Sequence, residues 1–118
     1  HGFRSDIWPV LAAADVVVVP SRQDESFGNT AVEGILAARP VVASDIAGLR
    51  EAVGEYDSAV FVAPGDSEEL AGALARIFSD WPSFHASAQA DREAALTRFA
   101  PDAYRRAVAA LMQGIARD

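Results

Sequence analysis

Two glutamates, Glu25 and Glu33, flank a short polar segment with one glycine, in an E-x7-E spacing. An ionised glutamate accepts hydrogen bonds through both carboxylate oxygens, which suits a ligand rich in hydroxyl groups. Between the two acids, Gly28 has no side chain, so a ligand can approach the backbone closely at that point. The segment therefore combines acceptors for hydroxyl groups with room for a ligand against the main chain.

The residues that follow Gly28 have the apolar spacing of a helix, and the first amides of a helix have no acceptor within it. We expect the N–H groups of Gly28, Asn29 and Thr30 to point into a cleft. There the helix dipole attracts an anion by a few tenths to about 1 kcal/mol, in addition to the hydrogen bonds. A diphosphate suits these donors, and a diphosphate beside hydroxyl-rich groups is the chemistry of a nucleotide sugar.

The same residues also have a purely structural interpretation. Thr30 and Glu33 match a capping box, in which the glutamate closes the start of the helix. Glu25 would then be a solvated acid of the loop. The spacing of the two glutamates does not by itself decide between a ligand site and these structural roles.

The elements that position this segment alternate between strands and helices. Val16–Val19 is a run of β-branched residues without a polar face, which predicts a parallel strand covered on both sides and ended by Pro20. Two further strands are expected at residues 41–43 and 59–62, and helices at 6–14, 30–38, 49–53, 66–78, 83–98 and from 101 onward. Such alternation predicts right-handed crossovers and a parallel α/β sheet.

Three strands are about half of a doubly wound nucleotide-binding sheet, which usually has about six. We therefore expect residues 1–118 to form a single partial domain, the second half of a Rossmann-like fold. The start at His1, without an initiator methionine, indicates a piece of a longer protein.

The composition excludes several classes of function. A formal net charge of -7 argues against a nucleic-acid surface, which would need a basic stripe. The chain has no cysteine and only two histidines, so we expect no metal centre. No apolar run approaches the length of a membrane span and no signal-peptide pattern opens the chain, so we expect a cytoplasmic location.

Four motifs in order resemble the carboxyl-terminal domain of the GT-B glycosyltransferases of family 4, also called group 1. They are Asp15–Ser21, Glu25–Gly28, Glu33–Gly34 and Pro40–Asp45. The resemblance extends from Gly2 to about Asp80, and the final helices are compatible with it. It implies a GT-B carboxyl-terminal domain that binds a nucleotide-sugar donor.

The resemblance also implies residue roles. Glu25 would be the catalytic acid of this half of the site and would contact hydroxyls of the transferred sugar, and Glu33 would accept hydrogen bonds from the ribose. The donor-binding residues would be Glu25, Ser26, Phe27, Gly28, Asn29, Thr30 and Glu33, with the backbone of residues 27–30 facing the diphosphate and sugar. The family is typically retaining, needs no metal, and takes its acceptor site and a phosphate-binding basic pair from regions upstream of this chain. Arg22 and Arg50 are near enough to the motif in sequence to be partial substitutes for that basic pair, but we favour the interpretation that they are ordinary surface arginines.

Several expectations about partners follow. The isolated chain should have little or no transferase activity, because the amino-terminal acceptor domain is missing. The alternative is a non-catalytic nucleotide-sugar-binding or interaction module with the same fold. The unpaired edge of the Val16–Val19 strand predicts a homodimer. Membrane association is expected, if at all, only as peripheral binding by the parent protein.

Overall fold

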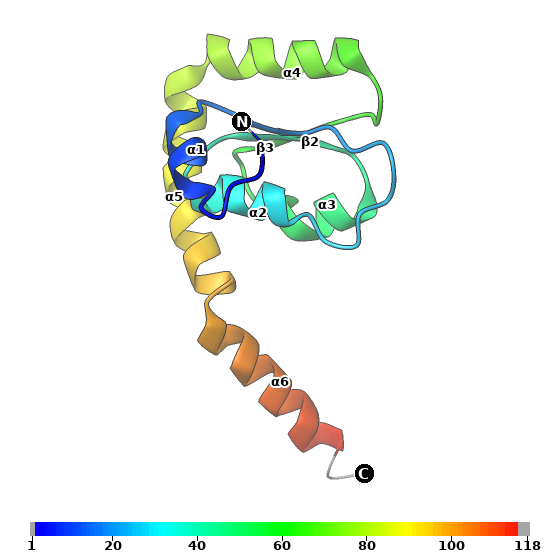
Figure 1. The fold of residues 1–118 in the computed structure, drawn as a ribbon, viewed down its shortest axis with the longest axis vertical. Helices are drawn as coiled ribbons and strands as arrows, with labels where there is room; N and C mark the ends of the chain where they lie inside the picture. Colours follow the sequence, from blue (N-terminus) through cyan, green and yellow to red (C-terminus); the bar gives the residue numbers. More distant parts are fainter. Residues whose placement is uncertain (1, 116–118) are drawn as a thin grey trace.

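A computed structural model describes residues 2–115. Its elements alternate as the sequence predicts (Figure 1). They are α1 (Trp8–Ala13), β1 (Val17–Val19), α2 (Asn29–Leu36), β2 (Val41–Ser44), α3 (Ala47–Val53), β3 (Ala59–Val62), α4 (Ser67–Ser79), α5 (Trp81–Arg98) and α6 (Pro101–Ile115). The predicted helices and strands are all present, with boundaries that differ by a few residues.

The three strands form one parallel sheet in the order β1-β2-β3. Val17 lies opposite Val41, and Val41 lies opposite Ala59. In Figure 1 the helix α4 runs along one face of the sheet, α2 and α3 lie on the other face, and α5 passes along one end. The α/β fold with a three-stranded parallel sheet is therefore confirmed.

The larger core lies between the sheet and the helices α2, α3 and α5. Gly34 brings α2 close to the sheet, because a Cβ atom at this position would be 2.8 Å from Val41 Cγ2 and 3.1 Å from Val17 Cβ. Ile35 and Leu49 are fully buried in this core, and truncation of such a side chain to alanine typically costs about 2–5 kcal/mol. The helix that follows the polar segment is thus fixed firmly to the strands.

The smaller core lies on the opposite face, where Val42 and Val60 pack against Ala73 and Ile77 of α4. Val18 lies on this same face but is 37% exposed. The prediction that this strand is covered on both faces is therefore wrong at Val18, and the strand begins at Val17 rather than Val16. The reason is that α4 contacts β2 and β3 and leaves β1 uncovered.

β1 pairs only with β2 among residues 2–115, so its outer edge has no partner strand in the described part of the chain. The backbone N–H and C=O groups on the outer side of β1 are available for pairing. An unpaired strand edge of this kind is prone to association with another strand.

The carboxyl-terminal helices differ from the expected ones in detail. We predicted that Trp81 and Pro82 separate two helices, whereas α5 begins at Trp81 and includes Pro82 in its first turn, where proline loses no helical hydrogen bond. α6 extends away from the rest of the molecule (Figure 1). Its predicted apolar face is present but solvent-exposed, with Tyr104 74%, Leu111 65% and Met112 60% exposed.

Candidate functional site

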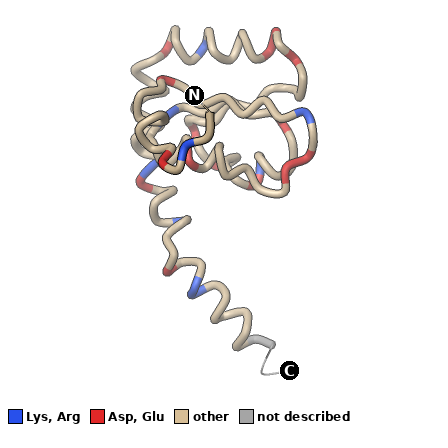
Figure 2. Tube along the Cα trace, in the orientation of Figure 1, with Lys and Arg blue, Asp and Glu red and all other residues tan. Residues whose placement is uncertain are grey.

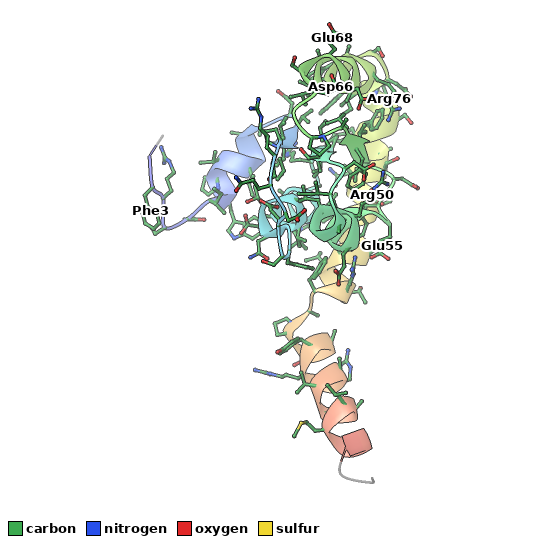
Figure 3. All side chains as sticks on the ribbon, turned by 90° about the vertical axis from the view of Figure 1, so that its right-hand side faces the viewer. Phe3, Arg50, Glu55, Asp66, Glu68 and Arg76 are labelled. Atoms are coloured by element: carbon green, nitrogen blue, oxygen red, sulfur yellow. The ribbon has the colours of Figure 1, made fainter. Side chains whose placement is uncertain are left out.

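The candidate segment connects β1 to α2 at the edge of the sheet where the strands end. Figure 3 looks toward this edge, with α4 above the sheet and α2 and α3 below it. In parallel α/β proteins, ligands bind outside the carboxyl ends of the strands. The structure therefore places residues 20–28 and the start of α2 where a ligand site of this fold is expected.

The start of α2 has unpaired backbone donors. Gly28 is the N-cap residue, no side chain caps the helix, and no acidic residue occurs in its first turn. The Asn29 amide donates to the Phe27 carbonyl oxygen at 3.0 Å, so the prediction that this amide is free is wrong. Within the described chain, the amides of Gly28, Thr30 and Ala31 have no acceptor. The turn at Phe27 uses one donor, and the Ala31 amide joins the set without an acceptor, although Ala31 is fully buried.

The capping box predicted as the alternative for Glu33 does not form. Because α2 begins at Asn29, Thr30 is already inside the helix and cannot act as its cap. Glu33 is a half-buried residue, and its carboxylate has no hydrogen-bond partner among residues 2–115. Glu33 therefore presents an unused acceptor one helical turn from the open amides.

Glu25 is held by its own loop. The Ser21 hydroxyl donates to Glu25 Oε1 at 2.9 Å, and Glu25 is a half-buried residue. This bond uses one carboxylate oxygen and leaves Oε2 without a protein partner in the described residues. Residues 21–25 line an open hollow at this point. The bond from Ser21 therefore orients the Glu25 carboxylate, and Oε2 can still accept a hydrogen bond from a hydroxyl group of a ligand.

Gly48 allows α3 to pack against the backbone of the loop, a role that the sequence did not predict. We expected this helix to begin at Leu49, but Ala47 and Gly48 already belong to α3. A Cβ atom on Gly48 would overlap the carbonyl oxygen of Glu25, so the first turn of α3 lies directly against the loop backbone. A glycine soon after a strand was the available signal, but its contact partner lies more than twenty residues upstream.

Arg50 is engaged in an ion pair and is not a free donor for a ligand. Its guanidinium donates to both carboxylate oxygens of Asp45, with Nε–Oδ1 and Nη2–Oδ2 distances of 2.6 and 2.8 Å, and lies 4.0 Å from the ring centroid of Phe61. The hydrogen bonds from Arg50 lower the pKa of the Asp45 carboxyl. Figure 3 shows Arg50 on α3, and the interpretation of Arg50 as a surface arginine is consistent with this pairing.

Arg22 has no ion-pair partner among residues 2–115. It lines a small pocket with Ser44 and Asp66, where the strand ends meet the start of α4. Charged residues of both signs are scattered over the described chain, and no basic face is formed (Figure 2). Arg22 is therefore the basic side chain of the loop, and it lies at the start of α4.

Other candidate chemistry is absent from the described part of the chain. No group of three or more His, Asp or Glu side chains within residues 2–115 could hold a metal ion. His85 is half-buried on α5 with its ring centroid 5.7 Å from that of Trp81, in agreement with a packing role. None of the helices between Gly2 and Ile115 is both long and apolar enough to cross a bilayer.

Comparison with known protein families identifies a match over residues 1–80, to the family described as "Glycosyl transferases group 1". Among curated proteins, the 2-deoxystreptamine glucosyltransferase of Streptomyces kanamyceticus is 38% identical over 90 residues, covering 76% of this chain and 23% of that protein. The D-inositol 3-phosphate glycosyltransferase of Saccharomonospora viridis is 46% identical over 72 residues, covering 61% of this chain and 16% of that protein. The chain thus spans about a quarter or less of these relatives' length.

Among solved structures, Anabaena Alr3699/HepE in complex with UDP-glucose superimposes with a TM-score of 0.87 and 31% identity. The match covers 97% of this chain and 31% of that protein. The same protein has also been solved with UDP. A glycosyltransferase from Rickettsia africae superimposes with a TM-score of 0.89 over the whole chain at 24% identity, a likeness of fold. These neighbours and this chain share one architecture.

Proposed function

The chain belongs to the group 1 glycosyl transferases, and from this premise we propose that residues 25–33 form the donor half of a nucleotide-sugar site. The observation that carries the proposal is the open start of α2. Three backbone amides without acceptors, those of Gly28, Thr30 and Ala31, lie beside two carboxylates that retain free acceptor capacity. A ligand that is anionic at one point and rich in hydroxyl groups at the adjacent points satisfies both sets.

Each residue then has a distinct role in binding. The amides of Gly28, Thr30 and Ala31 donate to the diphosphate, which the dipole of α2 also favours. Glu33, one turn further along α2, accepts from the ribose hydroxyls. Glu25, oriented by Ser21, accepts from hydroxyls of the transferred sugar and stabilises its position during transfer. Ser26, Phe27 and Asn29 shape the backbone between these groups.

UDP is the first nucleotide to test, because the structural neighbour at 31% identity binds UDP and UDP-glucose. The transfer that we propose retains the configuration at the sugar's anomeric carbon and requires an acceptor-binding domain outside residues 1–118. A basic pair upstream would neutralise the donor phosphates together with the α2 amides. The chain by itself should therefore bind a nucleotide without transferring its sugar.

The proposal is tested by titrating UDP and UDP-glucose into the 15N-labelled chain. We expect the amide signals of Gly28, Thr30 and Ala31 to shift with UDP, and UDP-glucose to shift the Glu25 region as well. Glu33→Gln keeps the shape of the side chain and removes its charge, so it should weaken UDP binding while leaving the fold intact. Glu93→Gln, at an exposed position on α5, is the matched control. Amide signals that stay unshifted with UDP, UDP-glucose and other nucleotide sugars would overturn the proposal.

A second candidate is a non-catalytic module that associates with another copy of itself. It is favoured by one observation, the unpaired outer edge of β1 with the exposed Val18 on it. In a homodimer two such edges, or an edge and a covering helix, would bury these groups. Sedimentation across a range of concentrations tests this candidate, because a monomer at high concentration contradicts it. Transfer of sugar by the 118-residue chain alone would contradict both candidates as stated.

A further inference from the structure

The end of α5 contacts the candidate donor loop through a pair of aromatic rings. The centroids of Phe27 and Phe99 are 6.2 Å apart with an interplanar angle of 72°, an edge-to-face arrangement. Phe99 is the C-cap residue of α5, and its amide donates to the Ala95 carbonyl oxygen at 2.9 Å. The two rings come from segments more than seventy residues apart, so the contact fixes the loop to a distant helix.

Arg98 anchors the helix end that carries Phe99. Its guanidinium donates to the carbonyl oxygens of Ala52 at 3.2 Å and Glu51 at 3.0 Å, and pairs with the Glu55 carboxylate at 2.6 Å. These acceptors lie at the end of α3, where the last carbonyl groups of a helix have no partner within it. Arg98 therefore locks the end of α5 to the end of α3.

The loop is thus held between two helices that are themselves joined. On one side, the first turn of α3 lies against the Glu25 carbonyl at Gly48. On the other side, Phe99 contacts Phe27, while Arg98 connects α5 to the opposite end of α3. α3 therefore carries a support for the loop at its first turn and an anchor for α5 at its last.

Phe27 is the residue through which this support reaches the amides. Its carbonyl oxygen accepts from the Asn29 amide at 3.0 Å, and it immediately precedes Gly28. The direction of the Gly28 N–H depends on the peptide plane that joins it to Phe27. Gly28 has no Cβ atom to restrict its backbone, so the position of Phe27 must be fixed from outside.

We propose that Phe99 is a positioning residue for the donor diphosphate. It holds the ring of Phe27, and thereby keeps the Gly28 amide, next to the Thr30 and Ala31 amides of α2, in the arrangement that binds the diphosphate. This inference rests on the proposed function. Phe99 touches neither donor nor acceptor in this scheme and acts only through Phe27.

The test compares Phe99→Ala with a control that removes a similar aromatic contact elsewhere. Phe78→Ala is that control, because Phe78 stacks on Trp81 with centroids 6.0 Å apart, between α4 and the start of α5. Hydrogen exchange of the Gly28, Thr30 and Ala31 amides and UDP affinity are measured in the 118-residue chain, under conditions in which both variants are folded. Phe99→Tyr retains the ring, and Phe99→Leu retains apolar volume without it.

We expect Phe99→Ala to weaken UDP binding about three- to tenfold, the range that one aromatic pair contributes. The three amides should exchange faster than in Phe78→Ala. Phe99→Tyr should restore both quantities, and Phe99→Leu should restore folding stability more than UDP affinity. A purely structural role would lower stability alike in Phe99→Ala and Phe78→Ala, without a selective effect on the loop.

The outcomes separate this inference from the function on which it rests. If the unsubstituted chain does not bind UDP or another nucleotide, the proposed function is overturned. If it binds UDP and Phe99→Ala binds equally well, only the positioning role is overturned. The same holds if the loop amides exchange equally in the Phe99→Ala and Phe78→Ala variants.

Discussion

Two helices, α2 and α4, each follow a strand of the same parallel sheet, yet their first turns are opposite in chemistry. At α4, Asp66 accepts from the amides of Glu68 and Glu69 at 3.0 and 2.9 Å, and Glu69 accepts from the Ala63 amide at 2.7 Å. Figure 3 shows Asp66 and Glu68 together at the start of α4. Two of the first amides of α4 are therefore satisfied by its N-cap acid.

At α2 the corresponding positions have no such acids. The N-cap residue is Gly28, the first turn contains no acidic residue, and the amides of Gly28, Thr30 and Ala31 are left without acceptors. Both helices have the same dipole direction relative to the sheet, so geometry alone does not distinguish them. What distinguishes the two helix starts is the absence of a cap at α2, where contacts from α3 and α5 support the preceding loop.

The largest expected effect comes from removing the support at α3. Gly48→Ala places a Cβ atom against the Glu25 carbonyl, so either the loop or α3 must move, at a cost of about 3 kcal/mol. Chemical denaturation should show this loss, and UDP binding should fall with it. Gly72→Ala is the control, since its Cβ atom meets nothing within 4 Å. It should stabilise α4 by about 0.5–1 kcal/mol. Equal stability of the two variants would contradict the close approach of α3.

The next largest effect is expected from removing the N-cap residue of α4. Asp66→Ala removes the cap of α4 and should lower the free energy of unfolding by about 1 kcal/mol. Because the α4 amides serve no ligand in our scheme, UDP affinity should stay unchanged. Asp66→Asn, which retains a capping oxygen, should recover most of the stability. Loss of UDP affinity in Asp66→Ala would indicate that the two helix starts are not functionally separate.

A smaller effect is expected from placing an acidic residue in the first turn of α2, which makes this helix start resemble that of α4. Asn29→Asp changes charge at nearly constant shape in the first turn of α2, where a negative charge stabilises a helix by about 0.3–1 kcal/mol. The same charge repels a diphosphate, so UDP binding should weaken by roughly two- to fivefold. Gln89→Glu adds the same charge at an exposed position on α5 and should leave UDP affinity unaffected. A rise in both stability and affinity would disprove the assignment of the diphosphate to this helix start.

The smallest effect concerns pH at the end of β2. The hydrogen bonds from Arg50 hold the pKa of the Asp45 carboxyl below its ordinary value. A carboxyl whose pKa is lowered by folding stabilises the protein above the unfolded pKa, and this contribution is lost as pH falls through the folded pKa. NMR titration should find the pKa of Asp45 below that of an unpaired aspartate, and Arg50→Gln should raise this pKa toward its ordinary value. An unchanged titration in Arg50→Gln would show that the pair is absent in solution.

Local sequence patterns predicted most of the fold. The apolar runs at residues 41–43 and 59–62 became β2 and β3, and the helix expected over residues 66–78 became α4. These signals are short-range, because burial on both faces and capping each involve neighbouring residues. The exposure of Val18 could not be predicted in this way, since it depends on where α4 lies across the sheet.

The site was predictable in position and less so in detail. Residues 25–33 lie at the carboxyl edge of the sheet as expected, but the Asn29 amide is used by Phe27 and the capping box at Glu33 does not form. The supports at Gly48 and Phe99 escaped the sequence interpretation because each acts on residues far away along the chain. The roles of Glu25 and Glu33 toward sugar and ribose remain proposals for the titrations above.

The anchor at Arg98 also bears on the order in which the chain folds. Its bond to the Ala52 carbonyl spans 46 residues, a separation that includes β3 and α4. Contacts of such long range form only after the intervening segments have condensed, because closing a long loop early costs chain entropy. We therefore expect β2, β3 and α4 to assemble first and α5 to dock afterwards. The loop before α2 would then reach its final conformation among the last parts of the molecule.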